Sequence, residues 1–299
     1  MKNSFKFFLW LSLFLYFVSV TSGVSQQTKP AQPSQESPPI AVQNVKGNIY
    51  EIKGGSGANT GFFIGEKEVL VIDAKMSAES TKQMIAEIKR LTSNPITCVV
   101  LTHSDGDHVN GLVSFPDVVK IIAHNQTRKD MEEAFKEPAQ RAYLPNLTFS
   151  ENMNLYSGNK VIKLIHFGPA HTSGDTVIYF PEEKVAFLGD LLFLGRDPLI
   201  HRPKGGNSFG LVKNLKAILE LDADTFVHGH GDVASRSDVE GVIKSLEEKQ
   251  AKIQALIKEG KSLEEIKKIF NIEDKPTPPG ARRFMSLVEV IYLELTEKK

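Results

Sequence analysis

Short apolar stretches separated by turn residues run through the middle of the chain. They are three to six residues long and rich in β-branched and aromatic side chains, a pattern typical of strands. Nine strands are predicted, at residues 49–52, 60–64, 69–72, 97–101, 120–123, 161–166, 176–180, 184–188 and 225–227. Helical spacing of apolar residues appears between them, at 78–91 and 208–221. Strands interleaved with helices predict the α/β class, with helices covering the sheets.

The two ends of the chain follow other patterns. After residue 234 the apolar spacing is helical, which predicts helices at 235–259, 263–270 and 282–295. Residues 24–43 are rich in Gln, Pro and Ser and hold few large apolar groups, as flexible tethers do. The pattern therefore predicts one domain at 44–234, preceded by the tether and followed by C-terminal helices at 235–299 that pack on it.

The first 23 residues have the layout of a secretory signal peptide. Lys2 and Lys6 precede an apolar run at 7–20, and small residues follow it up to Gly23. The run is shorter than the roughly 20 apolar residues of a membrane span, which favours cleavage near Ser22 or Gly23 over an uncleaved anchor. We expect an exported protein, periplasmic or secreted, that meets a membrane only during export.

The charge balance and the cysteine content limit which classes of function the chain can have. The 36 basic and 36 acidic side chains cancel, without a long run of either sign, so nothing favours capture of nucleic acid. We expect a small-molecule substrate as the partner, and the oligomeric state stays open. Cys98 is the one cysteine, so no intrachain disulfide forms. It lies in an apolar run without an adjoining base, which favours a core residue over a nucleophile.

Candidate metal ligands gather directly after the strand predicted at 97–101. The segment at 101–111 reads Leu-Thr-His-Ser-Asp-Gly-Asp-His-Val-Asn-Gly and holds four of them: His103, Asp105, Asp107 and His108. A loop at the end of a buried strand can turn closely spaced side chains toward one point, as metal coordination requires. A single histidine is more often structural, but four potential ligands within six residues favour a metal site.

Three further candidates follow at later strand ends. His171 lies in Gly-Pro-Ala-His-Thr-Ser-Gly-Asp, Asp190 ends the run at 185–190, and His230 lies in Gly-His-Gly. Glycines and other small residues surround each one. Glycine lets the backbone approach an ion closely, although the same glycines also serve simple turns.

Together these segments resemble the metallo-β-lactamase superfamily over about residues 45–232. Its signature is H-x-H-x-D-H, followed by a lone His, a lone Asp and a Gly-His-Gly. The resemblance implies a four-layered αβ/βα sandwich, here with a C-terminal helical extension and the site at one edge between the sheets. It also implies two divalent metal ions, and the ligands divide between them. The first set is His103, Asp105 and His171, the second is Asp107, His108 and His230, and Asp190 bridges both together with a hydroxide.

Position 105 departs from this family pattern, because Asp stands in place of the second His. With three carboxylates and a bridging hydroxide, two divalent ions form a cluster of charge near zero, where a His at 105 leaves +1. A more neutral cluster acidifies its water less, and a hard oxygen ligand makes iron or manganese more competitive with zinc, the metal otherwise expected. A related H-x-E-x-D-H variant occurs in the flavodiiron branch, which binds iron.

The resemblance implies a binuclear metallo-hydrolase, either glyoxalase II-like or β-lactamase-like. Metals would polarise the carbonyl of an ester-like, thioester, lactone or lactam bond and acidify the attacking water. Asp107 or a metal-bound water would deliver a proton to the leaving group, and Asp190 would hold both metals in place. Asp190 stands where the best-known secreted β-lactamases carry Cys, and looks more like glyoxalase II and lactonase branches. The alternatives are an iron-dependent redox enzyme of the same fold and a non-catalytic metal-binding protein.

Several nearby groups allow two interpretations. Asp73 either orients a ligating His or ends a strand in a turn, and His228 either faces substrate or ends its strand. Loops at 54–59, 126–147 and 194–207 are expected to shape the substrate site. The charges on the last loop either bind an anionic substrate or, as is favoured, are solvated: Arg196, His201, Arg202 and Lys204. His124 and His166 are predicted to be structural.

Overall fold

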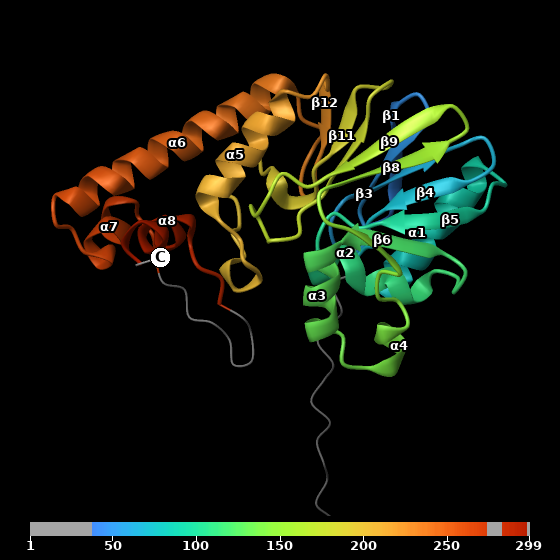
Figure 1. Cartoon of the computed structure of the whole chain (residues 1–299), viewed down its shortest axis with the longest axis horizontal. Helices are drawn as coiled ribbons and strands as arrows, with labels where there is room; N and C mark the ends of the chain where they lie inside the picture. Colours follow the sequence, from blue (N-terminus) through green and yellow to red (C-terminus); the bar gives the residue numbers. More distant parts are fainter. Residues whose placement is uncertain (1–37, 274–282, 298–299) are drawn as a thin grey trace, which may run out of the picture. The chain divides into compact units, whose positions relative to one another are not determined.

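A computed structural model describes residues 38–273 and 283–297, in which two β-sheets pack face to face (Figure 1). The larger sheet has the strand order β1-β2-β3-β4-β5-β6-β7: Ala41–Lys46, Ile49–Lys53, Thr60–Ile64, Val69–Ile72, Ile96–Val100, Lys120–His124 and Leu147–Phe149. The smaller has the order β12-β11-β10-β9-β8: Thr225–Val227, Val185–Phe187, Val177–Phe180, Lys160–Ile165 and Asn152–Ser157. The predicted signal peptide lies outside the described residues.

Strand direction brings several strand ends to one edge. Strands β1 to β4 pair antiparallel, and β4 to β7 pair parallel. In the smaller sheet β11 and β12 are parallel. Because parallel strands end at the same edge of their sheet, the loops that follow β4 and β5, and those that follow β11 and β12, lie near one another.

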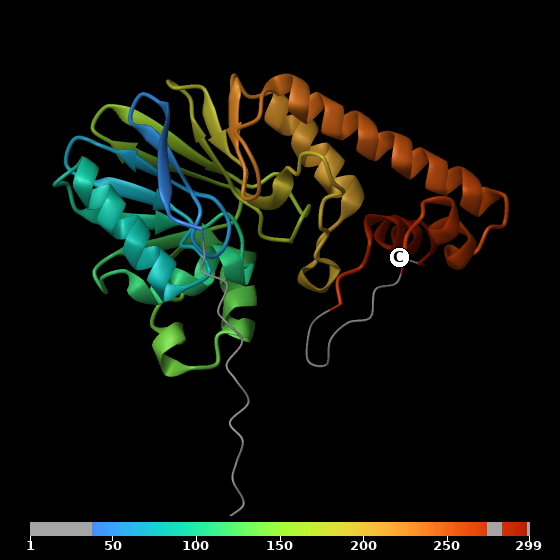
Figure 2. The same cartoon turned by 180° about the vertical axis from the view of Figure 1, so that it is seen from behind.

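Helices cover the outer faces of both sheets (Figures 1 and 2). On the larger sheet, α1 (Ala78–Leu91) buries Met84 and Ile88 against the strands. The helices packed on the smaller sheet or on one another are α5 (Ser208–Leu219), α6 (Arg236–Lys258), α7 (Leu263–Ile269) and α8 (Leu287–Thr296). A third apolar cluster fills the space between the sheets, with Phe63 and Phe180 among its members. This is the four-layered αβ/βα sandwich that the sequence predicts.

Local signals in the sequence explain where α1 and α6 begin. The Ser77 side chain accepts a hydrogen bond from the Ser80 amide at the start of α1. Ser235 and Asp238 form a reciprocal capping box at the start of α6. The apolar face of α6 then packs against α5 and α8, which joins the C-terminal helices to the core of the smaller sheet.

All nine predicted strands are present, with bounds shifted by one residue at most, but the pattern missed other elements. Strand β1 begins at Ala41, inside the predicted tether at 24–43, so that boundary is wrong; residues 24–37 lie outside the described part. Strands β7 and β8 were also missed, because polar residues interrupt them and β8 is half exposed. The expected loop at 126–147 contains most of α3 (Asn125–Ala134) and α4 (Pro138–Arg141). Helix α8 starts later than predicted.

No helix within residues 38–273 and 283–297 is both long and apolar enough to cross a bilayer.

Candidate metal centre

The candidate ligands all follow strand ends at one edge of the sandwich. After β5 the chain reaches His103 and then α2 (Gly106–Val109), a single turn that carries Asp107 and His108. His171 lies in the loop between β9 and β10, Asp190 in the 3-10 turn after β11, and His230 after β12. Four separate segments therefore build one site.

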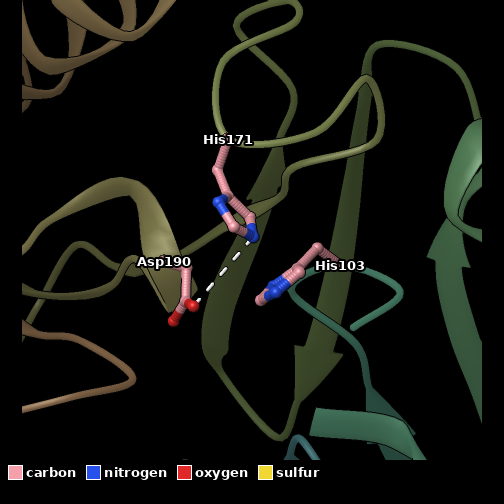
Figure 3. Close-up of side chains that lie close together, drawn as sticks. All are labelled: His103, His171 and Asp190. Atoms are coloured by element: carbon pink, nitrogen blue, oxygen red, sulfur yellow. Dashed lines mark ion pairs between the residues drawn. The ribbon is translucent and has the colours of Figure 1, made fainter. Parts of the chain in front are cut away.

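The first group of candidate ligands consists of His103, His171 and Asp190, whose side chains point toward one another (Figure 3). Their candidate ligand atoms lie within 4.8 Å of each other, and the three residues are buried. Asp105 joins this group, because its Oδ2 lies 3.1 Å from Nε2 of His171 and 3.8 Å from Nε2 of His103. The structure thus places Asp105 beside the histidines with which the sequence grouped it.

The second group consists of Asp107, His108 and His230, again with ligand atoms within 4.8 Å of one another. Nε2 of His230 lies 3.1 Å from Oδ2 of Asp107. Asp190 reaches this group too: its Oδ1 is 3.2 Å from Nε2 of His108 and its Oδ2 is 3.3 Å from Nε2 of His230. The same Oδ2 lies 4.0 Å from Nε2 of His171 in the first group, so one carboxylate faces histidines of both groups, which is the position of a bridging ligand.

Unpartnered buried atoms support a fit to metal. Nε2 of His103, Nε2 of His108 and Oδ1 of Asp190 are buried and have no hydrogen-bond partner of good geometry. Leaving a buried polar atom unpaired costs about 1–3 kcal/mol, so such atoms gathered at one point indicate a missing partner. Imidazole nitrogens and carboxylate oxygens suit zinc, iron and manganese. The residues present therefore fit a pair of divalent ions.

In the metal-free centre, the carboxylates and histidines shift one another's pKa values. Burial alone would raise the pKa of Asp190, but His108 and His230 hold it well below its usual range. Burial opposes a charge on His171, yet its contacts with Asp105 and Asp190 raise its pKa to about 9. Hydrogen bonds that the His230 ring donates to Asp107 and Asp190 raise the pKa of His230 to about 9 as well. Protons thus balance the carboxylates in the metal-free site, and a divalent ion would displace them.

Neighbouring groups orient the rings of two candidate ligands, His108 and His171. Asp73 Oδ2 lies 2.7 Å from Nδ1 of His108, and its Oδ1 accepts from the Thr102 amide at 2.8 Å. Nδ1 of His171 lies 2.8 Å from the Leu199 carbonyl oxygen. These contacts occupy Nδ1 and leave Nε2 facing the centre, as partners of metal-binding histidines do. Asp73 itself has φ +62°, an unfavourable value for a residue with a side chain, so it both turns the chain and orients His108.

Two residues of the loop at 194–207 contact the centre directly. Nδ1 of His201 lies 2.9 Å from Oδ1 of Asp105, and Nζ of Lys204 lies 2.6 Å from the same oxygen. The favoured interpretation of these side chains as solvated charges is therefore wrong for both. No sequence spacing links them to Asp105, which is 96 and 99 residues away. Arg202 instead pairs with Glu297 at the surface.

The other histidines and the cysteine lie apart from the two ligand groups. The rings of His124 and His166 stack with centroids 3.9 Å apart, and each bonds a backbone carbonyl, which supports a structural role. His228 is buried under Gly231 and does not line the cavity beside the ligands. Burial raises the pKa of Cys98 to about 12, which argues against a nucleophile.

A cavity of about 480 Å³ opens beside the ligands. One wall holds Asp105, Asp107, Asp190 and His230; the rest is lined by Phe193, Arg196, Asp197, Pro198, Leu199, Phe284, Met285, Ser286 and Leu287. Of the loops expected to shape the substrate site, only 194–207 contributes to this lining. The segment leading into α8 contributes as well, which the sequence did not indicate. Away from the ligands, the described part of the cavity lining is largely apolar and includes the guanidinium group of Arg196.

Comparison with known proteins gives consistent matches. Residues 54–230 match the model of the metallo-beta-lactamase superfamily. The 2,4-dinitroanisole O-demethylase subunit alpha of Nocardioides sp. (strain JS1661) is 24% identical over 88% of this chain and 80% of that protein. Hydroxyacylglutathione hydrolase GloC of Haemophilus influenzae is 31% identical over 56% of this chain and 81% of its own. A solved metallo-beta-lactamase from Pontibacter korlensis has a TM-score of 0.61 at 17% identity, covering 70% of this chain and 99% of that one.

Proposed function

The chain belongs to the metallo-beta-lactamase superfamily, and we propose that it is an exported binuclear metallo-hydrolase that cleaves an ester-like, thioester, lactone or lactam bond. The observation that carries this proposal is the position of Asp190 between the two groups of candidate ligands. Its carboxylate lies 4.0 Å from His171 of the first group and 3.2 and 3.3 Å from His108 and His230 of the second, next to unpartnered buried ring nitrogens. Hydrolases among the relatives support the reaction class. The neighbouring cavity offers room for a small organic substrate.

His103, Asp105 and His171 would hold the first ion, Asp107, His108 and His230 the second, and Asp190 both. When bound, such ions lower the pKa of a water molecule and polarise a carbonyl oxygen. The Asp107 side chain is 22% exposed and lines the cavity, which supports a role for its carboxylate in carrying a proton to the leaving group. The apolar wall that includes Phe193 and Phe284 would exclude water from the bound substrate. Zinc is the proposed metal. Iron and manganese are the alternatives, because the carboxylate of Asp105 is a hard oxygen ligand that suits them.

A second candidate reaction is cleavage of an aryl methyl ether. It is suggested by the name of the Nocardioides relative, whose alignment covers 88% of the chain and so must continue past residue 230 into α6. The aromatic side chains of Phe193 and Phe284 in the cavity suit an aryl group.

A substrate screen tests the proposal. Protein loaded separately with zinc, manganese or iron is assayed on thioesters, lactones, β-lactams, carboxylic esters and an aryl methyl ether. We expect turnover of at least one class, and a fall in kcat of about 10²–10⁴-fold for Asp107→Asn. Asp222→Asn, at a side chain that is 80% exposed, serves as the control and keeps full activity.

Three outcomes of the screen would contradict the proposed hydrolase function. Absence of turnover by metal-loaded protein in every class favours a non-catalytic metal-binding protein. Iron in protein purified without added metal, together with oxygen consumption, favours the redox alternative. Ether cleavage alone selects the second candidate reaction.

Export is tested separately by N-terminal sequencing of protein recovered outside the cytoplasm. We expect the mature chain to begin near Gly23 or Val24, because small residues follow the apolar run. An intact chain that begins at Met1 and stays in the membrane fraction contradicts this expectation.

A further inference from the structure

Asp105 is surrounded by groups that compensate its charge. Lys204 Nζ lies 2.6 Å from Oδ1 of Asp105 and 3.0 Å from both oxygens of Ser104. Nδ1 of His201 lies 2.9 Å from the same Asp105 oxygen. The Lys204 and Asp105 side chains are only 16% and 11% exposed, so water screens their attraction less than at the surface.

The two oxygens of Asp105 face different partners, apart from His201, whose Nδ1 lies 2.9 Å from Oδ1 and 3.2 Å from Oδ2. Oδ2 points toward His171 at 3.1 Å and His103 at 3.8 Å, where the first ion would bind. Oδ1 is the oxygen that Lys204 contacts. Asp105 therefore can offer one oxygen to a metal while the other stays paired with an ammonium group.

Backbone hydrogen bonds join the loop that carries Lys204 to the loop that carries His171. The His201 amide donates to the His171 carbonyl at 2.8 Å, and the Ser173 amide donates to the Lys204 carbonyl at 2.8 Å. Gly206 permits this approach, since a Cβ there would lie 2.3 Å from the His171 carbonyl oxygen. Lys204 is thus held in place by the backbone of a ligand loop.

We propose that Lys204 is a positioning residue that makes Asp105 a ligand of no net charge, electrically equivalent to the neutral His it replaces. The pair returns one positive charge to the site, so the cluster regains the charge that Asp105 alone removes. The sequence-based expectation of a less acidic water, which counted Asp105 without a partner, is revised accordingly. This inference rests on the metal site of the proposed function.

Three variants separate charge from packing. Lys204→Met removes the ammonium group and leaves an extra negative charge, which should tighten zinc binding about tenfold and move the pH at half-maximal activity up by about one unit. Asp105→Asn removes a negative charge, so it should weaken zinc binding and move that pH down. The double variant restores the net charge, and its pH midpoint should return to within a few tenths of the wild-type value.

Zinc affinity is measured by competition with a chelator, and the pH profile with the substrate found in the screen. Lys204→Arg keeps the charge and should keep the wild-type pH midpoint, while Lys213→Met, at an exposed lysine of α5, controls for a distant charge. If Lys204→Met does not fold, Lys204→Gln removes the charge and keeps a donor toward Ser104.

Two results overturn the inference. If Lys204→Met and Lys204→Arg weaken zinc binding equally and leave the pH midpoint unchanged, Lys204 only packs the loop, and the metal site itself still stands. If the wild-type chain binds no divalent ion, the proposed function falls and this inference falls with it.

Discussion

At the scale of single residues, the candidate metal centre leaves no spare room around the carboxylate of Asp190. A Cβ at Gly229 would lie 2.2 Å from Oδ1 of Asp190 and 2.9 Å from Cε1 of His108. Position 229, directly before His230, therefore requires a residue without a side chain.

Gly229→Ala should displace Asp190 from both ligand groups. Because misplacing a ligand typically costs 10- to 100-fold in metal affinity, we expect at least about a tenfold loss of zinc affinity and a comparable loss of activity. Gly241→Ala, in open space on α6, is the matched control and should stabilise the fold by up to about 1 kcal/mol. Unchanged zinc affinity in Gly229→Ala would show that Asp190 lies elsewhere in the loaded protein.

The raised pKa values of His230 and His171 predict how the stability of the metal-free fold depends on pH. The pKa of His230 is raised from 6.5 to about 9 by its bonds to Asp107 and Asp190. A raised pKa means that the protonated ring stabilises the fold fully below pH 6.5, and that this stabilisation is lost as the pH rises toward 9. His171 shifts in the same direction, to about 9.

We therefore expect the Tm of the metal-free protein to fall between pH 6.5 and 9, the window set by the His230 pKa. Zinc needs neutral imidazoles, so the increase in Tm that zinc produces should grow over the same window. Thermal unfolding with excess chelator and with zinc, at four pH values, measures both. A metal-free Tm that rises throughout this window contradicts the proposed pairing of histidines with carboxylates.

At the scale of elements, the loop at 54–59 is held by one buried lysine. Nζ of Lys75 donates to the carbonyls of Ile52, Gly54 and Ala58 at 2.8–3.1 Å, and burial lowers its pKa to about 8. The loop in turn donates from Ala58 to the Asp107 carbonyl and from Asn59 to the Gly229 carbonyl. It therefore braces two ligand-bearing loops, although it does not line the cavity.

Lys75→Met should leave three carbonyls without their donor and lower the free energy of unfolding by about 3 kcal/mol. Urea unfolding measures this, with Lys82→Met at an exposed position of α1 as the control, expected within about 0.5 kcal/mol of wild type. Equal stability of the two variants would mean that water replaces the ammonium group at no cost.

The sequence predicted helices and strands correctly where the local pattern of apolar residues is clear. The buried strand β4 is a continuous apolar run, and α6 combines a capping serine with a regular apolar face. Strand β8 alternates exposed polar residues with half-buried ones, and β1 lies at the edge of its sheet, so neither has a strong signal. These strands exist because their neighbours pair with them, which a local pattern does not contain.

At the scale of the whole molecule, the site joins segments that are far apart in sequence. The ligand motif after β5 was readable because four candidate ligands crowd within six residues. The contacts of His201 and Lys204 with Asp105 were not, because they depend on how two loops nearly 100 residues apart meet. The same holds for the cavity wall formed by the segment before α8. The sequence thus predicted a set of candidate ligands, and the structure brings these residues close together and adds the groups that surround them.

The central claim is that seven residues hold two divalent ions through one shared carboxylate. Metal content of purified, folded protein tests it most directly, in the wild type and in His171→Ala, His230→Ala and Asp190→Ala. The account predicts two ions per wild-type chain, loss mainly of the first ion in His171→Ala, loss mainly of the second in His230→Ala, and weakened binding of both in Asp190→Ala. His166→Ala, which changes a histidine outside the centre, should keep both ions. If the three ligand variants keep two ions and full activity, the assignment of the centre is wrong.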